Sequence, residues 1–535
     1  MKNFKRNLLY ILPLVVLFWS CEKDLDIYPK DDDEFTNEDF YANPASYKQF
    51  LAKIYAGLAL TGQNNVAGAS DLGAVDQGAV DEGYSQYLRG WWQLQELPTD
   101  EAIIAWTDPT LPDLNFGTWN ADNIYTEAFF ARIFFQIGLC NEFLRETTDA
   151  KLASRNVSDQ QKIEIQRFRA EVRFMRALSY YHGIDIFGKL PFGTDADLLG
   201  TPPEMQSRQF VFDYVLGELD AINDGLAPPK TNEYARADQA AAWMLKAKLL
   251  LNAKVYTGTD RSADALEAVN RVISSGYTIA PVYANLFKAD NNDNGAQNEV
   301  IFPIAYDGIQ TGSYGGTTFL VHGGASNSMA IILGVDNGWG GFRVRQEFAS
   351  TVGANDARVM YVPGNTDPAS ITNPTTATSS TAFDQGRKVM KFSNKKADGT
   401  PGKNATFPDT DFPLFRLGDA YLMYAELAAN GFGDKTTAVG YVNDLRRRAN
   451  GTNLAPIGIS DLTPDFVLNE RAKELYWEGY RRQDLIRFGK FSSGYNWQWK
   501  GGIQSGVEIP AYKQLYPIPN KEINTNPKLS QNPGY

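Results

Sequence analysis

The segment 158–187 constrains the fold of this chain more strongly than any other. Ser158 and Gln161 stand three residues apart at its start, which is the pattern of a capping box at the N-terminus of a helix. Apolar residues then recur at steps of three and four on one face, namely Ile165, Phe168, Val172, Met175 and Leu178. Gly188 and Pro191 follow as helix-ending residues. The spacing therefore predicts one long helix over 158–187.

Other segments with helical spacing follow it in the chain. Residues 240–255 and 262–275 flank a turn at 256–261, and a helix–turn–helix of this length resembles a tetratricopeptide unit. A second pair and three single helices are expected at 413–429, 436–448, 464–487, 40–60 and 120–148. We therefore expect a mostly α protein built on a tetratricopeptide-like helical-repeat scaffold.

Residues 276–412 differ from the helical segments. They are rich in Gly, Asn, Thr and Ser, and they contain a short strand candidate, Val300–Ile304. No linker separates folding units, so residues 36–535 are expected to form one domain in which a large loop-rich insert carries short strands. Loops on a rigid scaffold commonly hold binding sites. The ligand-binding subregions are therefore expected at about 61–120 and 276–412.

The N-terminus has the features of an exported lipoprotein. A basic start precedes the apolar run 8–19, which is shorter than the roughly 20 residues that span a bilayer and fits a secretory signal. Cys21 follows directly on a small residue, as in a bacterial lipobox. We expect a lipoprotein signal peptide over 1–20 and a lipid anchor to the membrane at Cys21. Residues 21–35 are acidic and are expected to form an extended tether.

The composition narrows the class of function. The formal net charge is −12, so the chain lacks the basic character of nucleic-acid-binding proteins, and no nucleic-acid partner is expected. Its two histidines, His182 and His322, nearly exclude histidine-based catalysis and multi-histidine metal sites. Cys140 is the one cysteine besides Cys21, so no intramolecular disulfide is expected.

Residues 290–295 imitate the first half of a calcium-binding loop. Ile301 stands where the closing glutamate of such a loop belongs, and no helical pattern flanks the segment. A solvated turn is therefore the main expectation, and no cofactor is required. A calcium site that uses Asp290, Asn292 and Asn294 is the alternative.

Tryptophan and acidic residues gather in the loops of residues 71–120. Sugars present flat apolar faces ringed by hydroxyls, so a sugar site needs an aromatic platform with carboxylates, amides or arginines at its rim. The candidates in this segment are Asp81, Arg89, Trp106 and Asp108. A second cluster holds Tyr306, Tyr314, Trp339 and Arg343. We expect Tyr314 and Trp339 to extend the platform into an aromatic arc.

An enzymatic alternative rests on four acids that lie near one another in the sequence: Asp76, Asp81, Asp100 and Glu101. A glycosidase needs two carboxylates roughly 5–10 Å apart. Acidic residues beside tryptophan are also what a passive sugar site contains, and no nucleophile-elbow motif occurs. We therefore expect a binding protein with no catalytic residues.

Three stretches, together with the lipobox, carry a resemblance to a known family. They are the Arg-rich helix and FGKLP turn of 167–191, ERAKELYWEGYRRQDL over 470–485, and the segment from YPIP to NPGY at 516–535. The set resembles the SusD/RagB family of outer-membrane nutrient-binding lipoproteins. The charged residues in these stretches are expected to lock packed helices through ion pairs rather than to line an active cleft.

The resemblance implies a lipid-anchored protein of the outer-membrane surface that captures oligosaccharides and passes them to a TonB-dependent SusC-like transporter. Asp81, Arg89 and Trp106 resemble, in order and spacing, the acid, arginine and tryptophan of the starch-binding members, which favours a starch-type α-glucan. Asp108 stands where those members carry an amide just after the tryptophan. β-Glucan (laminarin) and fructan therefore remain alternatives, as does a helical scaffold that binds a protein.

Overall fold

The computed structural model describes residues 36–63, 70–73, 81–353, 355–361 and 386–535. The predicted signal peptide 1–20, the lipidation site Cys21 and the predicted tether 21–35 lie outside the described residues, as does Asp76. Within the described ranges, no helix combines the length and the apolar character that crossing a membrane demands.

Helices make up most of the regular structure. The α-helices are α2 (Asn37–Tyr41), α3 (Ser46–Ala56), α4 (Tyr87–Glu96), α5 (Leu111–Phe116), α6 (Ile124–Glu146), α7 (Asp149–Ser154), α8 (Asp159–Ile186), α9 (Arg208–Ile222), α10 (Gln239–Leu251), α11 (Ala253–Thr257), α12 (Ser262–Ile273), α13 (Gly316–Gly323), α14 (Asn327–Leu333), α15 (Gln346–Val352), α16 (Leu417–Ala429), α17 (Lys435–Asn450), α18 (Pro464–Leu475), α19 (Arg481–Arg487) and α20 (Asn520–Thr525). The strands are β1 (Ala102–Ile104), β2 (Leu190–Phe192), β3 (Glu204–Gln206), β4 (Val300–Ile304), β5 (Phe342–Val344) and β6 (Phe412–Arg416).

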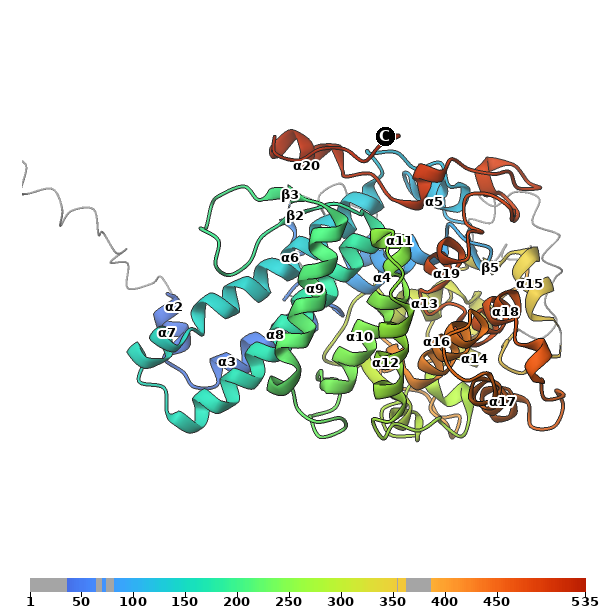
Figure 1. Ribbon diagram of the computed structural model, residues 1–535, viewed down its shortest axis with the longest axis horizontal. Helices are drawn as coiled ribbons and strands as arrows, with labels where there is room; N and C mark the ends of the chain where they lie inside the picture. Colours follow the sequence, from blue (N-terminus) through green and yellow to red (C-terminus); the bar gives the residue numbers. More distant parts are fainter. Residues whose placement is uncertain (1–35, 64–69, 74–80, 354, 362–385) are drawn as a thin grey trace, which may run out of the picture.

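The longer helices pack side by side in a continuous array (Figure 1). α6 packs on α8, α8 on α9, α10 on α12, α12 on α16, and α16 on both α17 and α18. The predicted pair 240–255 and 262–275 is present as α10–α11 and α12, with an interruption at Asn252. This arrangement confirms the mostly helical scaffold predicted from the sequence.

Helix α8 confirms the prediction over 158–187 almost residue for residue. The Ser158 hydroxyl caps it by accepting a hydrogen bond from the backbone N–H of Gln161 at 3.3 Å. The second half of the predicted capping box is wrong. The Gln161 side chain donates instead to the carbonyl oxygen of Pro44 at 2.8 Å, because the chain entering α3 lies against this end of α8.

Two other predicted helices are interrupted. The segment 413–429 begins as strand β6, because its first residues pair with β4, and it becomes helical only in α16. The segment 464–487 breaks into α18 and α19 at a turn where Trp477 and Gly479 have φ angles of 62° and 80°. A Cβ at Gly479 would lie 2.2 Å from the ring of Trp91, so this backbone approaches a neighbouring element too closely for a side chain.

The described chain contains three antiparallel sheets of two strands each: β1–β5, β2–β3 and β4–β6. The first and the third connect parts of the chain that are distant in the sequence. Strand β4 confirms the strand candidate Val300–Ile304. In the first sheet Ala102 pairs with Val344 and Ile104 with Phe342. This pairing joins the aromatic-rich loops after α4 to the loop-rich insert.

Buried ion pairs hold the helical half together, as predicted for the charged residues of 470–485. The Arg416 guanidinium lies 2.9, 2.8 and 2.7 Å from the carboxylates of Glu299, Glu474 and Glu478. All four side chains are fully buried. Removing one partner of such a group costs about 3–5 kcal/mol, because a buried charge is left uncompensated.

The C-terminal segment runs along the edge of the molecule, past α5 (Figure 1, red). The Tyr516 backbone N–H donates to the carbonyl of Ile186 at 2.8 Å. The Asn532 side chain donates to the carbonyls of Phe187 and Tyr516, both at 2.7 Å. These bonds fasten the proline-rich tail to the end of α8.

Candidate functional site

The pairing of β1 with β5 brings the two aromatic clusters of the sequence together. Just beyond β1, the Ala105 backbone N–H donates to the carbonyl of Gly341 at 3.0 Å. Trp106 therefore lies beside the residues that precede β5, and its indole N–H donates to the carbonyl of Trp339 at 3.4 Å. A Cβ at Gly341 would lie 2.8 Å from the Trp106 indole, so glycine is needed for this contact.

Four half-buried rings form a row, which we call the aromatic row: Trp106, Trp339, Tyr314 and Phe407. Successive ring centroids are 6.2, 6.1 and 5.4 Å apart. The ring planes are inclined to one another by 47°, 53° and 58°. The predicted extension of the platform by Tyr314 and Trp339 thus has the geometry of an arc rather than of a flat surface.

Phe407 was missed by the sequence analysis. It lies in the loop-rich insert between a run of Gly, Asn and Thr and the strand β6. Its aromatic character and its place in a predicted ligand-binding subregion were the available signals. Nothing in the local sequence shows that it meets Tyr314, which lies more than 90 residues earlier in the chain.

Arg89 and Asp81 form a bidentate ion pair, with N–O distances of 2.6 and 2.8 Å. Asp81 is 37% exposed, but the Arg89 side chain is fully buried. Its guanidinium lies 4.4 Å from the ring centroid of Phe319 and 5.9 Å from that of Trp106. The structure therefore places Arg89 beneath the aromatic row and not at its rim, because helix α4 is buried along its whole length.

Asp108 lies half-buried near this ion pair. Burial raises the pKa of its carboxyl, the positive charge of Arg89 opposes that rise, and the negative charge of Asp81 adds to it. The hydroxyl of Tyr125 is buried in the same region, and burial raises the pKa of this phenol well above its usual range. Asp108, two residues after Trp106, is thus less firmly ionised than a free aspartate.

Glu82 fixes the loop that carries Tyr314. The carboxylate of Glu82 accepts from the backbone N–H of Tyr314 at 2.7 Å and from the hydroxyl of Ser313 at 3.2 Å. A further hydrogen bond comes from the Thr61 hydroxyl. Tyr314 is therefore held in the aromatic row from the same segment that supplies Asp81.

Other aromatic candidates serve the core. Trp91 and Trp92 are buried in α4, and Tyr306 is buried with its hydroxyl 3.2 Å from the side-chain amide nitrogen of Gln86. Arg343 is fully buried in strand β5. These side chains pack behind the aromatic row and are not part of its surface.

Two of the four acids that suggested an enzyme, Asp100 and Glu101, are buried and bound to other parts of the protein. Both oxygens of Asp100 accept from the Arg481 guanidinium at 2.7 Å, and burial encloses the pair. The carboxyl of Glu101 accepts from the backbone N–H of Trp477 at 3.0 Å. Neither reaches the surface beside the aromatic row.

The calcium candidate has protein partners for its side chains. Both oxygens of Asp290 accept from the backbone N–H of Ala397 at 3.0 Å, and Asn294 donates to Asp290 at 2.9 Å. Among the residues the structure describes, no cluster of three or more His, Cys, Asp or Glu could hold a metal ion. Calcium binding through Asp290, Asn292 and Asn294 stays the alternative to the solvated turn that the sequence predicts.

A family model and the curated relatives of this chain point to the same family. Residues 342–535 match the SusD family model. The starch-binding protein SusD of Bacteroides thetaiotaomicron is 35% identical over 96% of this chain and 96% of its own length. SusD-like protein P2 of Formosa agariphila is 22% identical over 79% of this chain and 83% of its own.

Solved structures share the fold across almost the whole chain. Surface glycan-binding protein A from Bacteroides thetaiotaomicron, in complex with laminarihexaose, superposes with a TM-score of 0.66 at 20% identity, over 91% of this chain and 98% of that one. A SusD superfamily protein from Parabacteroides distasonis gives 0.67 at 20% identity, over 94% of this chain and 100% of that one.

A helical scaffold that presents aromatic rings while its buried acids hold the structure together is typical of a binding protein. The class defined by the comparisons is that of the non-catalytic glycan-binding proteins of polysaccharide utilisation. This chain belongs to the SusD/RagB family. It is therefore not an enzyme.

Proposed function

We propose that this protein captures a starch-type α-glucan on the aromatic row. The observation that carries the proposal is the half-exposed arc of Trp106, Trp339 and Tyr314, built from two segments more than 200 residues apart. Sugar rings stack their apolar faces on aromatic side chains, while polar groups at the edge bind the hydroxyls. Asp81, which is 37% exposed, and Asp108, which is half-buried two residues after Trp106, are the candidates for this polar edge.

The inclination of the rings favours a bent glycan over a flat one. Neighbouring rings differ in orientation by 47° and 53°, so a straight, ribbon-like chain could stack on one ring at a time. An α-linked glucan curves along its length and can present successive sugar faces to inclined rings. The 35% identity to a protein named for starch binding supports the same choice.

The Arg89–Asp81 pair has a supporting role in this proposal. Arg89 packs its guanidinium against Phe319 and approaches Trp106 from the buried side. A cation held against an aromatic face contributes about 0.5–2 kcal/mol. The pair thus fixes the orientation of Trp106, and Asp81 keeps an exposed edge for a sugar hydroxyl.

The proposal extends to the place of the protein in the cell. Cys21 anchors the chain to the outer membrane at the cell surface, and the captured oligosaccharide passes to a TonB-dependent SusC-like transporter. The lipobox-like sequence at Cys21 and relatives named as surface glycan-binding proteins support this part.

Affinity gel electrophoresis tests the glycan. Wild-type protein is run in gels that contain amylopectin, laminarin or inulin, beside Trp106→Ala and a Phe210→Ala control. Phe210 is 44% exposed on α9 and lies outside the aromatic row. We expect retardation by amylopectin that Trp106→Ala abolishes and Phe210→Ala leaves unchanged. Stronger retardation by laminarin or inulin would show that this glycan, and not starch, is the preferred ligand. Retardation by none of the three would favour a scaffold that binds a protein.

A further inference from the structure

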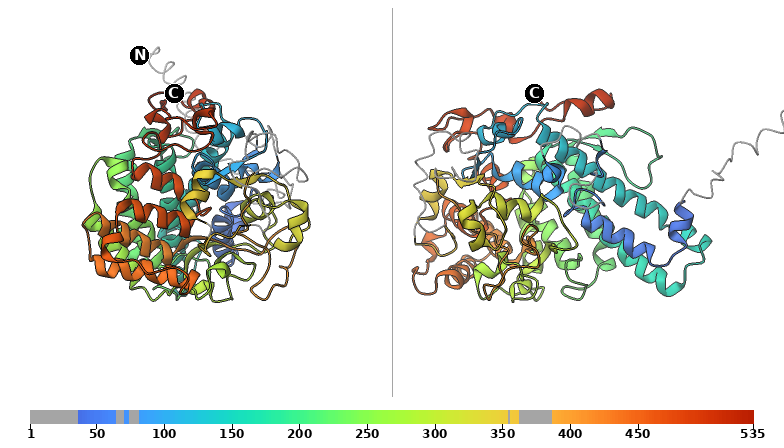
Figure 2. Two further views of the ribbon diagram at one scale, coloured as in Figure 1. Left: turned by 90° about the vertical axis from the view of Figure 1, so that its right-hand side faces the viewer. Right: turned by 180° about the vertical axis from the view of Figure 1, so that it is seen from behind.

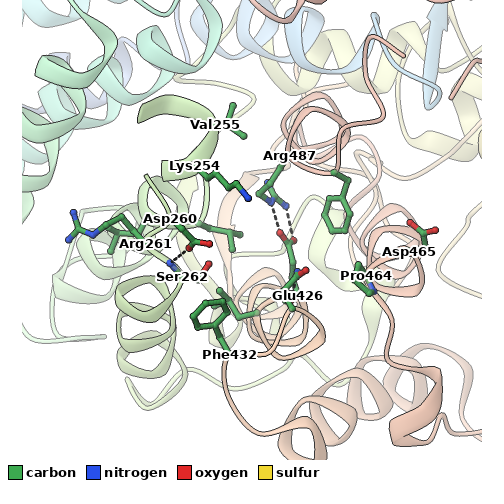
Figure 3. Close-up of a pocket in the computed structure, with 15 residues that line it drawn as sticks. Lys254, Val255, Asp260, Arg261, Ser262, Glu426, Phe432, Pro464, Asp465 and Arg487 are labelled. Carbon is green, nitrogen blue, oxygen red and sulfur yellow. Dashed lines mark hydrogen bonds and ion pairs between the residues drawn. The ribbon is translucent and has the colours of Figure 1, made fainter. Parts of the chain in front are cut away.

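A cavity of about 580 Å³ opens on the helical side of the molecule (Figure 3). It lies between the turn that joins α11 to α12, helix α16, the start of α18 and the end of α19. Cavities of about 300–1,000 Å³ are the usual size of small-molecule sites. The residues that matter to its chemistry are Lys254, Asp260, Glu426, Asn430, Phe432 and Arg487.

The cavity does not belong to the aromatic row. Helices α10 and α12 face the viewer in Figure 1. Seen from behind, in the right-hand view of Figure 2, the yellow insert comes to the front. A ligand in the cavity would therefore be bound on another face of the molecule.

One wall of the cavity is a closed ion pair. The Arg487 guanidinium binds the Glu426 carboxylate through two bonds of 2.5 and 2.8 Å. Its remaining contacts go to Asp484 at 2.7 Å and to the side-chain oxygen of Asn252 at 3.0 Å. Four of the five N–H groups of Arg487 thus bind protein groups, and two carboxylates balance its charge, so it offers little free positive charge to an anion.

Three other residues of the lining carry groups that can serve a ligand: Lys254, Asp260 and Asn430. Lys254 points toward the cavity in Figure 3, and its ammonium group forms no ion pair with any residue that the structure describes. Asp260 lies near it, with one carboxylate oxygen accepting from the backbone N–H of Ser262 at 2.8 Å. Asn430 donates through its side-chain nitrogen to the carbonyl of Glu426 at 2.9 Å, so its side-chain oxygen can act as an acceptor.

The charges of these groups determine whether the cavity suits an anion, a cation or a neutral ligand. The formal charges of Lys254 and Arg487 are matched by those of Asp260 and Glu426. An anion drawn to Lys254 would meet Asp260, and a cation drawn to Asp260 would meet Lys254. A hydroxyl can donate to a carboxylate or amide oxygen and accept from an ammonium group at the same time. The polar lining therefore suits a neutral molecule with several hydroxyls.

The half-buried ring of Phe432 adds an apolar surface at the bottom of the cavity in Figure 3. A neutral ligand with adjacent hydroxyls and one apolar face has the character of a sugar ring. From this match we infer that the cavity is a second saccharide site, which takes a short neutral oligosaccharide or the end of a longer one. Two sites on different faces of one molecule would bind a branched glycan more tightly than either alone.

Ligand-observed saturation-transfer NMR on the full-length protein tests this inference. The probes are maltotriose, laminaritriose and an inulin-type trisaccharide, each in excess over Trp106→Ala, in which the aromatic row is disabled. We expect saturation transfer to at least one probe. Adding Lys254→Ala and Asp260→Ala should reduce that transfer several-fold, and both residues are exposed, so the fold should be kept.

A matched control carries Asp444→Ala and Arg447→Ala on α17. These side chains are 50% and 66% exposed and form an ion pair at 2.9 Å outside the cavity. Transfer should survive in this control. Absence of transfer to all three probes in Trp106→Ala, or equal transfer with and without Lys254 and Asp260, would overturn the inference. Gel retardation by amylopectin tests the aromatic row separately, so the two proposals can fail independently.

Discussion

The imidazole of His322 lies stacked on the indole of Trp339, with ring centroids 4.7 Å apart and planes inclined by 24°. One ring nitrogen lies 2.8 Å from the carbonyl oxygen of Asn337, and the other lies 2.9 Å from that of Thr406. His322 therefore joins two loops and packs against Trp339, one of the two inner rings of the aromatic row. Both of its ring nitrogens thus lie within hydrogen-bonding distance of backbone carbonyl oxygens.

His322→Ala should weaken glycan binding, although His322 itself does not contact the glycan. The truncation removes the support behind Trp339 and both loop contacts, so the ring loses its fixed orientation. We expect about a tenfold loss of affinity, equivalent to about 1.4 kcal/mol, measured by isothermal titration calorimetry.

His182→Ala is the matched control for that experiment. His182 is also buried and packs on a tryptophan, Trp91, at 5.2 Å and 31°, but it lies outside the aromatic row. The His182→Ala variant should have a lower free energy of unfolding than wild type and an unchanged affinity for the glycan. Equal affinities for His322→Ala and wild type would show that Trp339 does not need this support.

Gly341→Ala should displace Trp106. The new methyl group would lie 2.8 Å from the indole, closer than any normal contact, so the ring must move. We expect weaker retardation in amylopectin gels and a modest drop in melting temperature. Gly440→Ala on α17 has open space around the new methyl group, so it should leave the retardation unchanged and raise the melting temperature slightly, because alanine is favoured over glycine inside a helix. Undiminished retardation of Gly341→Ala would argue against contact between Trp106 and the glycan.

The Asp81–Arg89 pair should show strong coupling in a double-mutant cycle. Asp81→Asn leaves the fully buried guanidinium without its counter-charge, and such losses cost about 3–5 kcal/mol. Exposure of Asp81 will reduce this cost, because solvent screens the pair. Asp81→Asn with Arg89→Met should be more stable than the sum of the single changes predicts. Urea denaturation measures all four proteins, and simple additivity would contradict a specific pair.

The neighbours Asp100 and Glu101 should contribute to the stability of the fold with opposite dependences on pH. Burial raises the pKa of Glu101 to about 7. Against the opposing effect of burial, the Arg481 guanidinium holds the pKa of Asp100 below its usual range. Protonated Glu101 contributes its full share of stability below the pKa of the unfolded chain, about 4.5. This contribution is lost as the pH rises through the pKa of the folded protein, about 7. Stability from the ionised Asp100 is present above about 3.8 and is lost as pH falls.

Glu101→Gln tests the first half of this behaviour. Because the amide cannot ionise, the variant should gain about 1–3 kcal/mol relative to wild type between pH 5 and pH 8. Asp100→Asn should instead be destabilised at pH 7, since Arg481 loses its counter-charge. Thermal unfolding across this pH range measures both. A pH-independent difference between Glu101→Gln and wild type would exclude a raised pKa at Glu101.

The amino-acid sequence by itself determined the elements whose formation is local. Helix α8 follows from the spacing of its apolar residues and from the residues at its ends, and it is present where predicted. The motifs of 167–191, 470–485 and 516–535 were enough to indicate the family. Helix hydrogen bonds join residues four apart, so the necessary information lies within a short stretch of chain.

Only the tertiary structure decided how the site is assembled. The contact of Trp106 with Trp339 depends on the pairing of β1 with β5 across more than 200 residues, and no local pattern encodes that register. The same holds for the burial of Arg89 beneath the aromatic row and for the break at Trp477, where a helical pattern gives way to close packing. Long-range packing outweighs local preference at these positions, because the free energy of burying large side chains exceeds that of one more helical turn.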